Sequence, residues 1–329
     1  MRVPFTLQAE YIFIEKNLSN YEHLNQYLSE QGLTPRFDKD IHLLHGEFTQ
    51  KLDEIIARIK RSRRCIFLLD QYGYSEVPFG DIRAIFHKLP NAEIILTFAT
   101  DWLIDYMANT PEYWKALQRT GIDQVLDVGR LLAEKSDNKD WRRLAQFELH
   151  RVIKSQSNAK HYTPFFIVSK EANRTFWLVH LSNHPRARDV MTELHWRLKN
   201  HFAHYGGPGI RMFGYDPAKD EHVTGVADLF SETEYSFDET AKNRTLQSMA
   251  VELPEVIHQS PDGIQFSELY RLIANTTPAT SQHIKEAITR LSDAKELEIL
   301  GPNGERRRKA NRVSNADVLR LPQQKTFTF

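Results

Sequence analysis

Short apolar runs alternate with helical patterns through the first hundred residues of the chain. The runs lie at Tyr11–Glu15, Ile41–Leu44, Cys65–Leu69 and Glu93–Phe98, and segments with apolar residues at helical spacing separate them. Strands that alternate with helices predict βαβ units and a parallel sheet. The run at Cys65–Leu69 is continuously apolar and stops at an acid, so we expect a strand buried on both faces.

The next hundred residues predict further helices and then a hairpin. Residues 101–157 have a mostly helical pattern, and the stretches 164–168 and 175–181 flank a polar turn. Two β-rich runs around such a turn are typical of antiparallel strands at the edge of a sheet. A helix is expected at 186–201. These elements together predict an α/β domain over residues 1–204.

The C-terminal part of the chain has a third pattern. Residues 205–244 are weakly periodic and predict a linker, and residues 245–329 predict a separate domain. Three helices followed by a β-hairpin are the elements of a winged helix, in their usual order. The expected helices lie at 251–258, 266–273 and 281–295, and the expected hairpin strands at 297–300 and 306–313.

Composition restricts the setting of the protein. Lys plus Arg and Asp plus Glu both number 43 among 329 residues, so any attraction to nucleic acid must come from a local patch. Cys65 is the one cysteine, which excludes an internal disulfide, and we expect it to be a buried thiol. The sequence shows neither a signal peptide nor an apolar run long enough to span a bilayer. We therefore expect a cytoplasmic protein without a membrane partner.

Acidic residues follow the first two predicted strands. Ligands of open parallel sheets bind at the carboxyl ends of the strands. Glu15 ends the first strand, where an acid can accept the ribose hydroxyls of a nucleoside cofactor, and Glu47 follows the second beside Gly46, where it could face an adenine. The alternatives are a surface acid at a strand end for Glu15 and an acid favoured by a helix dipole for Glu47.

The most apolar strand is followed by Asp70, Gln71, Tyr72 and Gly73. An unstacked base could lie on Tyr72 while its exocyclic nitrogen meets the oxygens of Asp70 and Gln71. Such a site would hold an amine nucleophile beside a methyl donor. The alternative is a polar turn between strand and helix, with Gly73 permitting a tight turn.

These strand-end motifs resemble those of the three-Cys-motif partner proteins, TcmP, which are methyltransferase-like. The resemblance covers roughly residues 11–200 and extends to the stretch Phe176–His184 followed by Met191. The family's turn is usually Asp-Pro-Tyr/Phe-Gly, and Gln71 stands here in place of the proline. The resemblance implies an α/β Rossmann-like sheet, S-adenosylmethionine as cofactor and a radical-SAM protein as partner.

One part of the methyltransferase pattern is missing. Only ten residues precede Tyr11, too few for the first strand and the glycine-rich loop that holds the methionine end of the cofactor. The cluster Gly206–Gly209 follows a predicted helix and does not replace that loop. We therefore expect an incomplete Rossmann-like methyltransferase sheet. Truncation, completion by a partner and loss of methyl transfer are the three explanations.

Two clusters in the predicted winged helix suit nucleic acid. Its third helix commonly enters a major groove, and its wing is rich in cations that suit phosphates. A platform for docking another protein is the alternative. The residues expected to contact nucleic acid are Gln282, Lys285 and Arg290 on the helix and Arg306, Arg307, Arg308, Lys309 and Arg312 in the wing.

No metal site is predicted. His195, His201 and His204 lie near one predicted helix end, but no carboxylate has supporting spacing, so we expect solvated histidines.

Two hypotheses follow. In the first, the winged helix delivers nucleic acid to a methyltransferase-like site that transfers a methyl group by direct displacement. In the second, a non-catalytic adaptor binds nucleic acid, keeps a degenerate methyltransferase fold and works with a partner protein. A nucleotide-cleaving effector is a third possibility for which no motif speaks.

Overall fold

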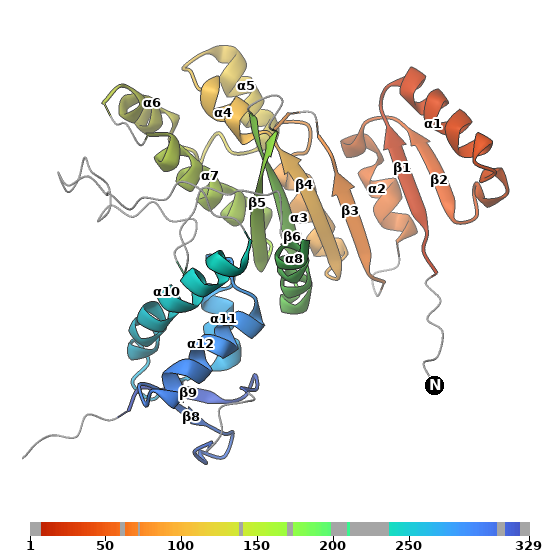
Figure 1. Ribbon diagram of the computed structural model, residues 1–329. Coiled ribbons are helices and arrows are strands. Elements are labelled where there is room, and N and C mark those ends of the chain that lie inside the picture. The colour runs from red at the N-terminus through yellow and green to blue at the C-terminus, as the bar shows by residue number, and fades with distance from the viewer. Residues whose placement is uncertain are drawn as a thin grey trace, which may run out of the picture.

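The computed structural model shows an α/β domain and a C-terminal winged-helix domain (Figure 1). The structure describes residues 8–59, 63–71, 73–137, 141–169, 174–198, 209–210, 237–307 and 313–322. Within these residues no helix is both long and apolar enough to cross a membrane.

The first sheet has two parallel strands, β1 (Tyr11–Glu15) and β2 (Ile41–His45), in the register Tyr11 to Ile41. Helix α1 (Leu18–Glu30) connects them, together with the short 3-10 helix η1 (Thr34–Arg36). Asn17 caps α1 by accepting hydrogen bonds from the N–H groups of Ser19 and Asn20, which satisfies two donors at the helix start. Both predicted strands and the helix between them are confirmed.

The second sheet has four strands in the order β3-β4-β6-β5. β3 (Cys65–Leu69) and β4 (Ala92–Phe98) are parallel, and β6 (Arg174–Ser182) pairs antiparallel with both β4 and β5 (His161–Ser169). The predicted hairpin is therefore confirmed, and the sheet is mixed. α2 (Phe48–Arg58) leads into β3, and α3 (Phe79–Lys88) connects β3 to β4.

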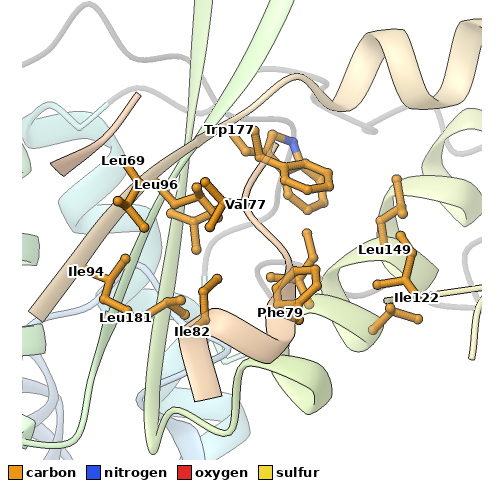
Figure 2. Close-up of a cluster of buried hydrophobic side chains, with 14 of the residues drawn as sticks. Leu69, Val77, Phe79, Ile82, Ile94, Leu96, Ile122, Leu149, Trp177 and Leu181 are labelled. Carbon is orange, nitrogen blue, oxygen red and sulfur yellow. The ribbon is translucent and has the colours of Figure 1, made fainter. Parts of the chain in front are cut away.

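The core of this domain lies between the sheets and the helices on one face. Val77, just before α3, and Phe79, its first residue, belong to one buried cluster with Ile94 and Leu96 of β4 and Trp177 of β6 (Figure 2). Removal of this apolar surface from water is the main favourable term in the folding of the domain. The remaining helices of the domain are α4 (Thr100–Asp105), α5 (Pro111–Thr120), α6 (Val128–Asp137), α7 (Trp141–Ser157) and α8 (Pro185–Leu198).

The prediction that β3 is buried on both faces is wrong. Phe67 and Leu69 are buried, but Ile66 is 66% and Leu68 is 71% exposed. β3 lies at the edge of its sheet, and only the face with Phe67 and Leu69 is covered by helices. A continuous apolar run is consistent with burial on both faces, but it does not say whether both are covered.

The winged helix has three helices and a three-stranded sheet of order β7-β9-β8. Its first helix begins inside the predicted linker, because Asp238 caps it through the N–H of Ala241. The strand that pairs with β8 lies beyond the expected segment 306–313, and among the described residues of that segment Arg306 makes a bridge to Leu300. The elements are α10 (Glu239–His258), β7 (Ile264–Gln265), α11 (Phe266–Ile273), α12 (Ser281–Asp293), β8 (Glu298–Leu300) and β9 (Val318–Arg320).

Two charged residues of α8 hold the winged helix against the α/β domain. The fully buried guanidinium of Arg188 donates to the carbonyls of Thr277 (2.7 Å) and Ala279 (2.6 Å). The carboxylate of Asp189 accepts hydrogen bonds from the N–H (2.8 Å) and the hydroxyl of Ser281. Because both charges are buried and bonded, the segment between α11 and α12 has one well-defined position.

Further bonds continue this interface. The indole N–H of Trp196 donates to the carbonyl of Pro278 (2.8 Å), and the amide of Asn275 bonds the backbone of Lys160 and Tyr162 at 2.9 and 3.0 Å. Phe237, just before α10, packs with Phe165 of β5. The two domains therefore form one connected unit.

We expect Arg188→Ala to destabilise the protein by about 3 kcal/mol, because it leaves two buried carbonyls without their donor and removes the cation that lies 3.8 Å from the buried carboxylate of Asp189. Urea unfolding followed by circular dichroism measures the loss. Arg186→Ala is the control, because Arg186 is 62% exposed and its ion pairs are worth little. Equal losses of stability in the two variants would contradict this role of Arg188.

Candidate nucleic-acid interface and strand-end site

The carboxyl ends of β1 and β2 bring Glu15 and Glu47 near one ammonium group. The ammonium of Lys16 lies 2.9 Å from the carboxylate of Glu76. A hydrogen bond and the charge of Glu76 raise the pKa of Lys16, and the charges of Glu47 and Glu15 contribute less. Three carboxylates therefore share this end of the sheet with one cation.

The backbone ties these strand ends together. The N–H of Gly46 donates to the carbonyl of Glu15 (3.0 Å), and Gly46 has a φ of 144°, a conformation that favours glycine. The carboxylate of Glu15 accepts from the N–H of Asn17 at 2.7 Å. Glu47 is the exposed N-cap residue of α2, although its side chain makes no capping bond. Both acids thus have local structural roles beside the predicted one.

Asp70 and Gln71 follow β3 but differ in surroundings. The exposed carboxylate of Asp70 accepts a hydrogen bond from the hydroxyl of Thr97 (2.8 Å). The buried amide of Gln71 donates to the carbonyl of Thr97 (3.0 Å) and accepts from the N–H groups of Glu76 and Val77, both at 3.1 Å. These bonds favour a structural role for Gln71, holding the loop that leads into α3.

The rest of the turn adds little to the predicted site. The φ of Gly73 is not in the left-handed region, and a Cβ there would meet no atom within 4 Å, so the turn does not require glycine. Tyr72 lies outside the described residues. A catalytic role for Asp70, Gln71, Tyr72 and Gly73 stays a prediction.

The chemistry of this set of donors does not fit the whole of S-adenosylmethionine. Glu15, Glu47 and Asp70 are acids, which suit hydroxyl and amino groups such as those of adenosine. The methionine part carries an ammonium and a sulfonium, which these charges attract, and a carboxylate, which they repel. Lys16 is the nearby cation, and Glu76 already pairs with it.

Helix α12 has one buried and one accessible side. Ile284 and Ile288 belong to the core of the winged helix, whereas Gln282 and Arg290 are exposed. Lys285 is half-buried, with its ammonium 4.9 Å from the ring centre of Phe266. The structure thus places the three predicted residues of α12 where a ligand can reach them, although Arg290 also bonds Glu286 at 2.7 Å.

The wing is less cationic than the sequence predicts. Arg306 lies 3.4 Å from the carboxylate of Glu298, and Arg307 lies 2.6 Å from that of Asp317. Burial alone would raise the pKa of Asp317, but hydrogen bonds from Ser314 and Arg307 outweigh it and lower the pKa. Arg307 therefore stabilises the wing. Arg308, Lys309 and Arg312 lie outside the described residues.

The winged helix and the strand-end acids lie at opposite ends of the sheet (Figure 1). Asn275 bonds Tyr162 near the start of β5, at the level of the first residues of β4 in the pairing register. Asp70 and Thr97 lie at the other end of β3 and β4. A seven-residue strand is about 20 Å long. Nucleic acid on α12 would thus lie away from the strand-end acids of the same chain.

His195 of α8 is not solvated as expected. His195 is buried and stacks on Phe165, and burial lowers its pKa to about 4. His201 and His204 lie outside the described residues, and within those residues no three metal-binding side chains form a group.

Residues 214–304 match a family model described as a GMT-like wHTH domain. This part of the chain is a winged helix. The GMT-like type is associated with methyltransferases, and the match reaches from the predicted linker to the tip of the wing. No curated protein matches the chain.

Sequence reasoning missed a buried polar stripe on α8 that includes Arg188, which docks the GMT-like winged helix. Arg188, Thr192 and His195 lie at positions i, i+4 and i+7 of α8, and all three are buried. Such spacing marks one side of a helix. A polar stripe at this spacing was a signal that α8 makes a hydrogen-bonded contact.

We expect Gln71→Ala to lower the free energy of unfolding by about 2 kcal/mol, because two buried N–H groups and a carbonyl lose their partner. Urea unfolding measures it. Asp70→Asn serves as the control, since its carbonyl oxygen still accepts from Thr97, and should change stability by less than about 0.5 kcal/mol. A neutral Gln71→Ala would contradict the structural role.

We expect the interface between the domains to weaken as pH falls from about 6.5 to about 4. His283 of α12 packs edge-on against Trp196 of α8, and burial lowers its pKa to about 4. The folded pKa lies below the unfolded value, so its contribution is complete above pH 6.5 and is lost towards pH 4. Thermal unfolding across this range measures the effect. The melting temperature should depend less steeply on pH in His283→Asn than in the wild type, and an unchanged dependence would exclude His283 as a cause of the loss of stability at low pH.

Proposed function

We propose that this chain is a nucleic-acid-binding adaptor that keeps a methyltransferase-type sheet without carrying out methyl transfer by itself. The observation that carries the proposal is the position of the winged helix. Buried bonds from Arg188 and Asp189 fix it at the end of the sheet opposite the strand-end acids. In this arrangement a nucleic acid held by α12 does not reach Asp70.

The accessible side of α12 supports nucleic-acid binding. Gln282 suits hydrogen bonds to base edges, and the ammonium of Lys285 suits phosphate. Arg188 and Asp189 of α8 bond Thr277, before α12, and Ser281, its first residue. These bonds leave Lys285 and Arg290, further along α12, accessible. Arg308, Lys309 and Arg312 are proposed as further phosphate contacts.

The strand-end residues support the non-catalytic part of the proposal. Gln71 is bonded by its own loop and by the carbonyl of Thr97 on β4, and the three nearby acids offer no partner for the carboxylate of S-adenosylmethionine. Catalysis would therefore need groups from a partner. The TcmP resemblance makes a radical-SAM protein one candidate.

Methyl transfer is the second candidate function, because Glu15 and Glu47 lie at adjacent strand ends where an adenosine ribose could bind. Calorimetry with S-adenosylmethionine separates the two. The adaptor predicts no binding to the chain alone, and binding lost in Glu15→Ala would favour the enzyme.

Fluorescence anisotropy with a labelled mixed-sequence DNA duplex, and with the matching RNA, tests the adaptor. We expect Lys285→Ala to weaken binding about fivefold and to reduce the slope of log affinity against log salt by about 1, because one phosphate contact is lost. Lys88→Ala on α3 is the matched control, and it should bind as the wild type does. No binding, or equal loss in both variants, would reject the proposal.

A further inference from the structure

Strands β1 and β3 present unpaired edges to each other. β1 pairs with β2 and β3 with β4, and among the described strands neither has a second neighbour. Lys16 directly after β1 bonds Glu76 in the loop after β3. β1 lies between β2 and β3 in Figure 1, and the arrows of β1 and β3 point the same way. Each of the two small sheets therefore has an open edge on the side of the other.

The side chains beside these open edges are apolar and exposed on one face only. Phe67 and Leu69 belong to the core with α2 and α3, and Ile12 and Ile14 of β1 pack against the same core. The opposite face of β3 presents Ile66 and Leu68, at 66% and 71% exposure. An apolar edge strand with an uncovered face is an unusual surface in a soluble protein, and it indicates a contact.

Helices flank this uncovered face on both sides. Tyr21 of α1 contacts His45 of β2, which shares its face with Tyr11 and Phe13 of β1. On the other side, α8 packs on β5 and β6 over the same face of the sheet. β3 lies between them, and no helix among the described residues covers that face of β3. The helical layer is thus interrupted where the sheet is also interrupted.

α8 has apolar side chains for a further helix in that layer. Val190, Leu194 and Leu198 lie at positions i, i+4 and i+8 and are 48%, 36% and 59% exposed. Residues at this spacing share one side of a helix. They form a stripe distinct from the buried side that carries Arg188 and Asp189.

We propose that another protein inserts a β-strand between β1 and β3 and covers Ile66 and Leu68 with the helix that follows the strand. The strand runs parallel to β1 and β3 and hydrogen-bonds to both, which joins the two small sheets into one. Its side chains towards α2 and α3 are apolar. This interaction is independent of nucleic-acid binding by the winged helix.

Charge at the strand ends fits the same occupant. A helix that follows a parallel strand begins at the carboxyl end of that strand, where Glu15, Glu47 and Glu76 outnumber Lys16. The positive end of a helix dipole is stabilised near carboxylates. The partner is thus an α/β protein segment with an apolar strand and a helix whose first turn lacks acids.

In-cell photo-crosslinking from p-benzoylphenylalanine at position 66 of the full chain tests the proposal. We expect a crosslink to a strand–helix segment of another protein, mapped by mass spectrometry, and at least tenfold less crosslinking from position 272. Leu272 on α11 is the matched control, because it is an apolar residue that is 52% exposed. The purified partner should slow amide hydrogen exchange in both β1 and β3.

A single substitution on the exposed face distinguishes loss of the contact from loss of folding. Leu68→Lys with wild-type residues elsewhere should fold normally, because this side chain is exposed, and should lose the protection of β1 and β3 by the partner. No crosslink at position 66, a crosslink to a second copy of this chain, or a partner that leaves exchange in β1 and β3 unchanged would overturn the proposal.

Discussion

The buried guanidinium of Arg188 determines how the two domains of this protein are related. A buried charge must be bonded, and Arg188 is bonded by the carbonyls of Thr277 and Ala279 just before α12. Asp189 bonds the first residue of α12. The start of α12, the proposed nucleic-acid-binding helix, is therefore part of the interface. Only the outer side of that helix is accessible to nucleic acid.

The same contact keeps the winged helix away from the acids at the strand ends. It holds the GMT-like winged helix at the amino ends of β3 and β4, whereas Asp70, Glu15 and Glu47 lie at the carboxyl ends. In methyltransferase-type sheets that second end is the expected place of a cofactor. A chain with these two features suits an adaptor that binds nucleic acid at one end. Its other end, beside the open strand edges, is then available to a partner.

Local patterns predicted the elements well. Periodicity identified β1 to β4, the β5–β6 hairpin and the order of the winged helix, because each depends on neighbours in sequence. Contacts between distant residues could not be predicted in this way. The cations of Arg306 and Arg307 are offset by Glu298 and Asp317, and Gln71 bonds Thr97 on the next strand. Exposure of Ile66 and Leu68 likewise depends on whether a distant element covers that face of β3.

Distance measurement between two spin labels tests the fixed placement of the winged helix most directly. Labels on cysteines introduced by Arg290→Cys on α12 and Glu47→Cys at the strand ends, with Cys65→Ser, report the separation of the two sites. We expect one narrow distance distribution that does not change when a DNA duplex binds. A broad distribution, or one that shifts to shorter distances with DNA, would contradict it.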